Sequence, residues 1–138
     1  MENIAKAILK DVPISTKQSI EIASFIRKKN LPMAKEMLNQ VMLKKQAVPF
    51  RRFNRDMGHK PGIAAGRYPI KAVKYFLQLL NLAEANAQFK NLNVNNLMIK
   101  IIKANKGTTT SRYGRQVRRK AKRTNLEIVV EETKEIKK

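Results

Sequence analysis

Apolar side chains recur with the period of an α-helix in three parts of the chain. The pattern predicts helices over residues 16–29, 32–47 and 69–88. The segment Ser15–Gln18 has the S-x-x-Q form of a capping box, in which side chains satisfy the free amides at a helix start. Pro32 opens the second helix, where its missing amide proton leaves no hydrogen bond unmade.

The second predicted helix carries methionines on the face that is expected to be buried. Methionine is a flexible apolar side chain that fills irregular gaps, so we interpret the methionines on this face as core side chains. The positions that share the face at helical spacing are Met33, Ala34, Met37, Leu38 and Val41.

Alternation of apolar and polar side chains predicts three strands. Residues 1–14 alternate loosely and are predicted to form a short strand that ends at Pro13. Residues 97–102 and 126–130 also alternate, and a long connection separates them. On the first of these two strands, one face carries Leu97, Ile99 and Ile101, and the other carries Met98, Lys100 and Ile102.

The connection between the last two strands, Asn105–Asn125, is far longer than the turn of an ordinary β-hairpin. Such a loop is either disordered, or its strands continue outward as a β-ribbon that something outside the chain supports. Residues 49–67 show no period either, and we predict an irregular basic loop there. The mixture of helices and strands predicts an α+β fold, with one domain over residues 1–138.

The charge of the chain points to an extended anionic partner. Its 138 residues include 30 Lys and Arg against 10 Asp and Glu, for a formal net charge of +20. The positive charges repel one another in the isolated protein, and a bound polyanion that neutralises them removes this unfavourable energy. The apolar share of 43% is close to that of globular proteins, so the chain can still form a core. Nucleic acid is therefore the first candidate partner.

The composition gives little support to several other classes of function. The absence of cysteine excludes disulfides, thiol catalysis and cysteine-ligated zinc, and it fits a cytoplasmic location. A single histidine, His59, and scattered acids are too few for a catalytic or metal site, so we expect no enzyme, metal or cofactor. No apolar run approaches the length of a membrane span, and Met1–Asn3 do not begin a secretory signal. We therefore expect neither a membrane nor a small-molecule substrate as the partner.

Acidic residues are absent from a long part of the C-terminal half. No Asp or Glu lies between Glu84 and Glu127, whereas four glutamates occupy the last twelve residues. This distribution predicts a basic segment surrounded by an anion, followed by an acidic end that stays in solvent.

The strongest candidate for nucleic-acid binding is the segment Thr108–Arg123. Seven of the twelve residues from Arg112 to its end are cationic. Arginine can hydrogen-bond two phosphate oxygens at once, Tyr113 offers a stacking surface, and the hydroxyl residues add neutral donors. The alternative is a solvated basic loop or a localisation tract. The residues predicted to bind RNA here and on the preceding strand are Lys103, Lys106, Arg112, Tyr113, Arg115, Arg118, Arg119, Lys120, Lys122 and Arg123.

A second candidate lies in Phe50–Arg55 and continues to Gly62. Aromatic residues interleaved with arginines suit RNA, because unpaired bases stack on the rings while the phosphates require cations. The alternative is that Phe50 and Phe53 close the end of the core while the arginines are solvated. The residues predicted to bind RNA in this part of the chain are Arg51, Arg52, Phe53, Arg55, His59, Lys60 and Arg67.

Four motifs, taken in their order, resemble a known protein family. They are Ala47–His59, Gly66–Pro69, Gly114–Arg115 and Thr124–Glu132. Together they are similar to the archaeal branch of the universal large-subunit ribosomal protein family that is numbered twenty-two in bacteria and seventeen in eukaryotes. The likeness covers nearly the whole chain, from Ile14 to Glu132.

The resemblance implies an α+β body with three helices packed on a small three-stranded antiparallel sheet, and a long protruding β-hairpin. By this resemblance the body comprises residues 1–104 and 124–132, the hairpin 97–131 with its tip at about 106–116, and a flexible tail 133–138. The hairpin would project through rRNA to the wall of the polypeptide exit tunnel. The residues expected to face the tunnel at the tip are Thr109, Thr110, Ser111, Arg112, Tyr113 and Gly114.

The same resemblance implies that Lys106, Gly107 and Arg112–Arg115 lie at the far end of the hairpin, and that Arg118–Arg123 lie on its returning strand. It also implies a structural constituent of the large subunit in the cytoplasm, which does no chemistry and aids subunit assembly. Its partners would be large-subunit rRNA, neighbouring ribosomal proteins and the nascent polypeptide chain. The alternative is a free-standing basic regulator or nucleoid protein that binds duplex DNA. Composition does not separate the two, but the order of the motifs and the long ribbon favour the ribosome.

Overall fold

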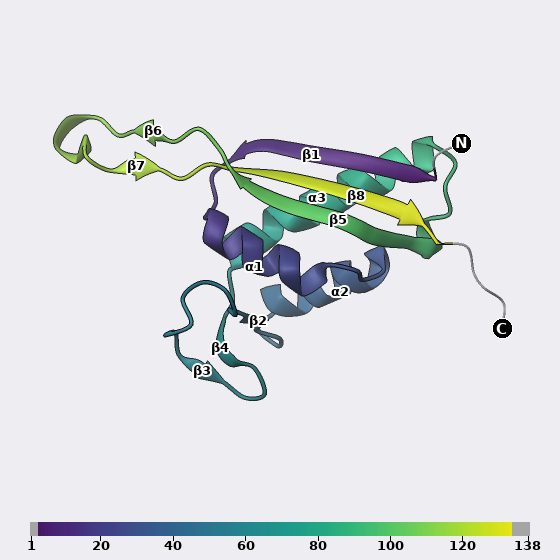
Figure 1. Cartoon of the computed structure of the whole chain (residues 1–138), viewed down its shortest axis with the longest axis horizontal. Helices are drawn as coiled ribbons and strands as arrows, with labels where there is room; N and C mark the ends of the chain where they lie inside the picture. Colours follow the sequence, from purple (N-terminus) through teal and green to yellow (C-terminus); the bar gives the residue numbers. More distant parts are fainter. Residues whose placement is uncertain (1–2, 134–138) are drawn as a thin grey trace.

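An antiparallel sheet of three strands forms one layer of the body in the computed structural model, which describes residues 3–133 (Figure 1). The strands are β1 (Ile4–Val12), β5 (Leu97–Lys106) and β8 (Thr124–Glu132). β8 lies in the centre and pairs antiparallel with β1 on one side and β5 on the other. The predicted tail at 133–138 lies outside the described residues, apart from Thr133.

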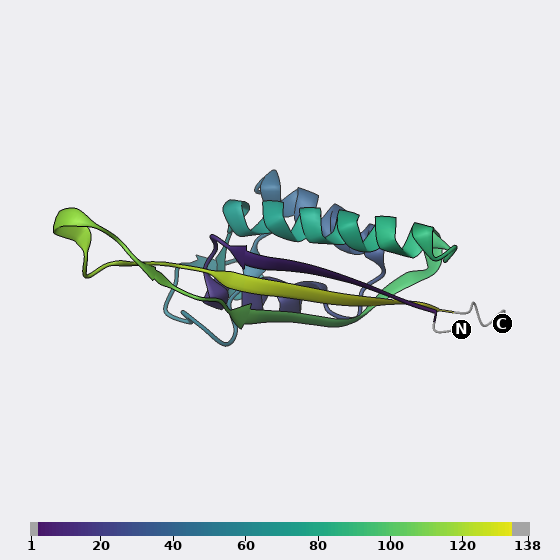
Figure 2. The ribbon, with the colours of Figure 1, turned by 90° about the horizontal axis from the view of Figure 1, so that it is seen from above.

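Three helices form the second layer. They are α1 (Thr16–Ile26), α2 (Leu31–Met42) and α3 (Ile70–Phe89). α3 packs on β1 and β8, α1 packs against β5, and α2 lies beside α3. Figure 2 shows α3 along one side of the sheet, with the opposite side of the sheet left without a helix. The predicted α+β fold, with three helices on a three-stranded antiparallel sheet, is confirmed.

The core fills the space between the helices and the inner face of the sheet. Each fully buried aliphatic or aromatic side chain stabilises the fold by about 1.5–3 kcal/mol relative to exposure to water. The largest buried side chains come from all three helices and from β5 and β8, so the core joins the N-terminal and C-terminal parts of the chain. They are Ile22, Ile26, Leu31, Leu38, Phe76, Leu79, Leu80, Leu97, Ile99, Ile102, Leu126 and Ile128.

The start of α1 was placed correctly, but its predicted capping box is wrong. Ser15 is the residue before the helix, yet its side chain makes no capping hydrogen bond. Instead, its carbonyl oxygen accepts from the backbone N–H of Ser19 at 3.0 Å and from the Ser19 hydroxyl at 2.8 Å. The hydroxyl of Thr16 lies 2.9 Å from that of Thr124, on a strand far away in the sequence.

α1 ends at Ile26, three residues before the predicted Lys29, because the chain that follows pairs with the sheet. Lys28 has a positive φ of 60°, which stops the helix. Its N–H donates to the Ile99 carbonyl at 3.2 Å, and the Ile99 N–H donates back to Lys29 at 3.0 Å. Hydrogen bonds to the edge of β5 thus replace the last turn of the predicted helix.

α2 ends at Met42 rather than at residue 47, and Lys44 adopts a positive φ of 57° just beyond it. Its buried positions are Leu31, Ala34, Leu38 and Val41. The interpretation of Met33 as a core side chain is wrong, because that side chain is 50% exposed. The stripe that meets α3 is centred on Ala34 and Leu38, and Met33 lies to one side of it.

A β-bulge in β5 breaks the predicted alternation of side chains. Ile99 faces Val130 on β8, and Ile101 faces the next residue, Val129, so Lys100 has no partner in the register. As a result Ile102 turns into the core, whereas Ile101 is 39% exposed on the opposite face. The predicted grouping of Leu97, Ile99 and Ile101 on one face is therefore wrong at its last member.

The segment 49–67, which we predicted to be irregular, belongs to a small sheet that begins at Val48. Its strands are β2 (Val48–Pro49), β3 (His59–Lys60) and β4 (Ala64–Arg67), in the order β2-β4-β3. Strands of two to four residues are too short to show a period, which explains why the pattern missed them. Phe50, at the end of β2, is buried in the core.

A glycine at the base of the hairpin is tightly enclosed. A Cβ on Gly107 would lie 2.8 Å from Oδ1 of Asp11 and 3.1 Å from Cβ of Arg123. We expect Gly107→Ala to lower the free energy of unfolding by about 1–2 kcal/mol in urea titrations, because the Asp11 carboxylate has to shift and Arg123, whose carbonyl carbon lies at 3.2 Å, has to give way. Gly58→Ala is the matched control, since its Cβ would meet nothing within 4 Å. Equal stability of the two variants would show that the base of the hairpin is loosely packed.

Candidate nucleic-acid interface

The hairpin extends beyond the sheet as a thin two-stranded ribbon (Figure 1). β6 (Thr110–Ser111) pairs with β7 (Lys120–Ala121), and η2 (Gly114–Gln116) forms a single helical turn at the tip. The Arg112 N–H donates to the Arg119 carbonyl at 2.9 Å and closes the turn. All ten residues from 111 to 120 are exposed, so every predicted RNA-binding side chain of the tip is accessible.

The hairpin leaves the body at a fixed point, which we call the root. Here Lys106, the last residue of β5, pairs with Thr124 of β8. Thr124 is fully buried, and its hydroxyl donates to the Ile14 carbonyl at 2.9 Å. The expectation that Lys106 and Gly107 lie at the far end of the hairpin is therefore wrong. Pairing of β5 with β8 continues to Lys106, and the ribbon beyond it consists of residues 107–123.

Two hollows at the root are lined by cationic side chains from separate elements. Both include Lys122 and Arg123, which return the chain from the ribbon to β8. Lys17 of α1 joins the first hollow and Lys71 of α3 joins the second, so the helices add charge to the hairpin. The first is lined by Ser15, Thr16, Lys17, Lys106, Thr109, Lys122 and Arg123. The second is lined by Pro13, Lys71, Arg112, Lys120, Ala121, Lys122 and Arg123.

Sequence reasoning missed Lys17 and Lys71 as parts of this surface. Each belongs to an amphipathic helix, where a solvated lysine is the ordinary interpretation. Nothing in their sequence neighbourhood connects them with Lys122, which lies about 50 residues from one and about 100 from the other. Only the packing of α1 and α3 against the sheet brings these lysines to the root.

The arginine loop, residues 50–55, is held by a buried carboxylate of α1. Glu21 is only 2% exposed. Its Oε1 accepts from the N–H groups of Arg52 and Phe53, each at 2.8 Å, and its Oε2 accepts from that of Arg51 at 3.2 Å. These three hydrogen bonds fix the backbone of the loop, while its guanidinium groups stay exposed. Glu21 was also missed, because one acid beside an apolar face gives no signal in the sequence.

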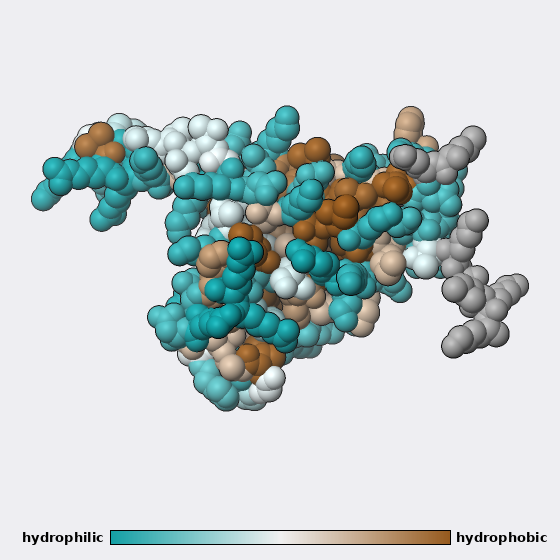
Figure 3. Space-filling view, viewed as in Figure 1, coloured by the Kyte–Doolittle hydropathy of each residue, from teal (hydrophilic) through white to brown (hydrophobic). Residues whose placement is uncertain are grey.

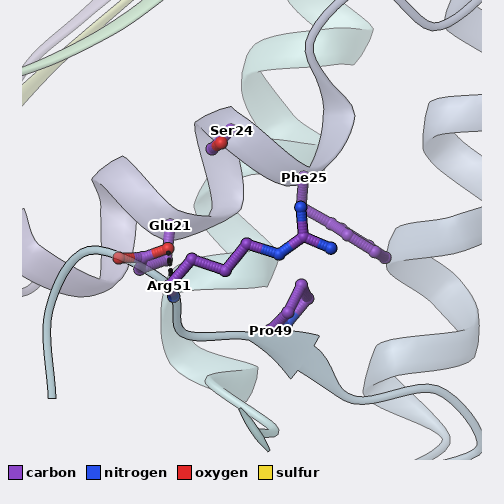
Figure 4. A pocket seen from close by; sticks show the side chains of 5 residues that line it. All are labelled: Glu21, Ser24, Phe25, Pro49 and Arg51. Atoms are coloured by element: carbon purple, nitrogen blue, oxygen red, sulfur yellow. Dashed lines mark hydrogen bonds between the residues drawn. The ribbon is translucent and has the colours of Figure 1, made fainter. Parts of the chain in front are cut away.

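A shallow hollow beside Glu21 shows how Arg51 is placed (Figure 4). Its lining residues are Glu21, Ser24, Phe25, Pro49 and Arg51. The backbone of Arg51 is bound by Glu21, and its side chain extends along the hollow toward Phe25. The guanidinium is thus presented on the surface of the molecule rather than buried.

The aromatic residues of this region have different environments. Phe50 belongs to the core, as the alternative prediction had it. Phe53 is half-buried, and the cationic groups of Lys17 and Arg52 lie 5.8 Å and 5.3 Å from the centre of its ring. Lys60 lies 5.5 Å from the ring of Tyr68 in the same manner. The other predicted residues of this patch, all exposed, are Arg51, Arg55, His59 and Arg67.

One helix connects the two cationic regions. Thr16, the first residue of α1, lies 2.9 Å from the buried Thr124 hydroxyl at the root. Five residues later Glu21 binds the arginine loop, and Lys17 lines the root hollow and lies near the ring of Phe53. α1 therefore fixes the arginine loop relative to the hairpin, and the two patches form one cationic surface.

The charges of this surface are not compensated within the described residues, 3–133. Two ion pairs occur there, Lys35 with Glu84 and Lys100 with Glu131. Neither includes a residue that we predicted to bind RNA. The cations of the hairpin and the arginine loop are therefore available to an external anion.

A family model described as ribosomal protein L22p/L17e matches residues 7–131, from the middle of β1 almost to the end of β8. The chain belongs to this family. The match spans the root, the whole hairpin and the arginine loop, so the cationic surface lies within the part that the L22p/L17e family shares. The resemblance found in the sequence is confirmed, and the chain is a ribosomal protein of the large subunit in the cytoplasm.

Individual relatives agree with the family assignment. Proteins named large ribosomal subunit protein uL22 from Nanoarchaeum equitans, Ignicoccus hospitalis and Thermoplasma acidophilum are 47%, 44% and 44% identical to this chain. The alignments cover 98%, 95% and 96% of this chain and 82%, 89% and 91% of those proteins. The similarity is thus to archaeal members of the L22p/L17e family and extends over nearly their full length.

The described part of this L22p/L17e chain holds neither a metal-binding cluster nor a membrane-spanning helix. Within residues 3–133, no three side chains of the His, Cys, Asp and Glu types gather closely enough to bind a metal ion. None of the helices there combines the length and the apolar character needed to cross a bilayer.

Proposed function

We propose that this chain binds large-subunit rRNA through one surface made of the hairpin, its root and the arginine loop. The observation that carries the proposal is the uncompensated charge of that surface, in a member of a ribosomal protein family. The protein is structural: it neutralises phosphates, holds RNA segments in place during subunit assembly, and carries out no reaction. The body serves as the anchor and the hairpin as the extension.

Recognition of RNA shape, rather than of base sequence, agrees with the chemistry of the surface. Arginine and lysine side chains dominate it, and hydroxyl groups of Thr109 and Ser15 at the root add neutral donors for phosphates and 2′-hydroxyls. The one fully exposed aromatic residue among those predicted to bind RNA in the described chain is Tyr113, at 93%. Stacking on a base is therefore assigned to the tip of the hairpin, and phosphate binding to the root and the arginine loop.

The reach of the hairpin supports the finer proposal that its tip lines the polypeptide exit tunnel and meets the nascent chain. Beyond the root, the ribbon from Gly107 to Gly114 has eight residues, which an extended strand converts to a length of about 25 Å. A compact body of this size has a diameter of about 30 Å. The ribbon thus adds nearly one body diameter to the length of the molecule, which allows its tip to pass through a layer of RNA to an interior space.

The assignment to the large subunit is tested by sedimentation. Cell extracts are separated on sucrose gradients in low and in high salt, and this chain is detected in each fraction. A ribosomal protein held by many phosphate contacts within the subunit stays with the large subunit through a high-salt wash. A free-standing regulator or nucleoid protein that binds duplex DNA would be absent from those fractions, and that result would overturn the proposal.

Shortening the hairpin tests the tunnel proposal. Arg112–Arg119 is replaced by the two-residue turn Asn-Gly, since Ser111 and Lys120 are already paired partners across the ribbon. We expect the variant to enter large subunits, because the root and the arginine loop still anchor it, and to lose crosslinking to a stalled nascent chain.

A second variant separates the reach of the tip from its charge. It keeps the full length and carries glutamine at the four cationic positions of the tip, Arg112, Arg115, Arg118 and Arg119. This variant is expected to retain the crosslink to the nascent chain. If both variants fail to enter subunits and the parent gives no crosslink, the tip is an assembly anchor and the tunnel assignment is wrong.

A further inference from the structure

The face of the sheet opposite the helices is open and carries apolar side chains among charged ones (Figure 2). In Figure 2 the helices lie on the other side of β1, β8 and β5, and Figure 3 shows hydrophobic side chains gathered over these strands. Ile8 is 53% exposed, and Ile101 is exposed there because the β-bulge turns it outward. Val129 is only 6% exposed and lies opposite both Lys6 and Ile101 in the strand register, whereas Ile8 lies opposite Glu127. Each of the three strands thus places one apolar side chain on this face, and we call Ile8, Val129 and Ile101 together the apolar strip.

The charges next to this strip are largely compensated, unlike those of the hairpin. Lys100 forms an ion pair with Glu131 at 2.8 Å, and Lys103 lies opposite Glu127 in the strand register. Lys6 and Lys10 remain on β1 without a carboxylate partner among the described residues. The open face is therefore an apolar strip with two unmatched cations at one edge.

The edges of the sheet beside this face are already occupied. The carbonyl groups of Lys6 and Ile4 on β1 accept from the side chains of Asn86 at 2.7 Å and Lys90 at 2.9 Å, both from α3. On the other edge, Ile99 of β5 is bonded to the segment 28–30. A partner at this end cannot add a strand to either edge, so it has to pack on the face itself.

We propose that this open face is the docking site for a neighbouring protein of the large subunit, and specifically for an apolar segment flanked by carboxylates. The inference rests on the proposed ribosomal function. Covering an apolar strip with the apolar side chains of a partner is favourable, because it removes apolar surface from water. Phosphates bind to cations instead, and the cations are concentrated elsewhere on this chain. Carboxylates on the partner would complement Lys6 and Lys10.

A second copy of this chain is a poor occupant for the same face. Two copies that met here would bring Lys6 and Lys10 of one chain toward those of the other, within two molecules of net charge +20 each. A partner with the opposite edge charge avoids this repulsion. The face therefore favours a different protein.

The test uses the absence of cysteine from the chain, which allows a single reactive thiol to be introduced. Ile8→Cys and Ile101→Cys variants are prepared, and maleimide labelling is followed in the free protein and in purified large subunits. We expect labelling in the subunit to be at least about tenfold slower, since the centre of a protein interface excludes water. Labelling at the rate of the free protein would overturn the proposal.

The occupant is identified by photocrosslinking in intact large subunits. Benzoylphenylalanine is placed at Ile8, and in a control variant at Tyr113 of the hairpin tip. The proposal requires a nuclease-resistant crosslink from position 8 to another protein, at a segment that contains apolar and acidic residues. A crosslink from position 8 to RNA, or to a second copy of this chain, would overturn it.

The same experiment separates this inference from the proposed function. A nuclease-sensitive crosslink from both positions would leave rRNA binding intact and refute only the docking site. Absence of the protein from the large-subunit fraction would refute the proposed function, and the docking site with it.

Discussion

Replacing Arg118, Arg119, Lys120, Lys122 and Arg123 with alanine is expected to reduce the slope of log affinity against log salt by about 3.5–4.5 units for RNA fragments of the large subunit. Each phosphate contact releases condensed counterions, and each lost contact removes about 0.7–0.9 from the slope. Between about 50 and 200 mM salt, the affinity of the variant should then fall about 130- to 500-fold less than that of the parent. Filter binding or fluorescence anisotropy over a salt series measures the effect.

The body of this variant should remain folded, because the substituted side chains lie outside the core. Arg123 contributes to the root through its backbone, whose carbonyl accepts from Gly107 at 2.8 Å, and alanine retains that bond. The control replaces Arg118, Arg119 and Arg123 with lysine, which preserves the charge and should preserve the slope. An unchanged slope in the alanine variant would move the main phosphate contacts to the arginine loop.

Glu21→Ala is expected to lower the free energy of unfolding by about 2–4 kcal/mol. The substitution removes a buried acceptor of three backbone hydrogen bonds and leaves the amides of Arg51, Arg52 and Phe53 without their partner. Urea unfolding at equilibrium measures the loss. Amide hydrogen exchange should show that protection disappears at those three residues before it disappears in the core.

Two further variants define the role of this carboxylate. Glu21→Gln keeps a carbonyl oxygen that can serve Arg52 and Phe53, so its loss should be about half that of Glu21→Ala. Glu36→Ala is the matched control on α2, where the glutamate is exposed and should change stability by less than about 0.5 kcal/mol. If Glu21→Ala unfolds at the same urea concentration as Glu36→Ala, the loop does not depend on the carboxylate.

The two cationic regions were recognisable in the sequence because charge density is a property of short segments. Thr108–Arg123 and Phe50–Arg55 stand out by composition alone, without any knowledge of the fold. The contribution of Glu21 was not recognisable, because its partners lie about 30 residues away and are backbone groups, which every residue has. The cationic residues of the interface could thus be predicted, whereas the buried carboxylate that fixes the arginine loop could not.

Periodicity by itself determined that this chain has three helices and strands at 97–102 and 126–130, and it left the long connection between these strands open as a disordered loop or a ribbon. These predictions succeed because an amphipathic element repeats its apolar positions within a few residues. The family motifs then added the arrangement of these elements as helices on a three-stranded sheet. All of this information is local or follows the order of the chain.

Only the tertiary structure decided where the elements end, where β5 bulges and which side chains meet at the root. α1 ends at Ile26 because residues 28 and 29 bond to Ile99, about 70 residues away. The root depends on Thr16 and Thr124, which are 108 residues apart. Long-range hydrogen bonds of this kind are similar in strength to the local preference of a segment for helix or strand. The long-range partner therefore determines where an element ends, and no local sequence pattern shows it.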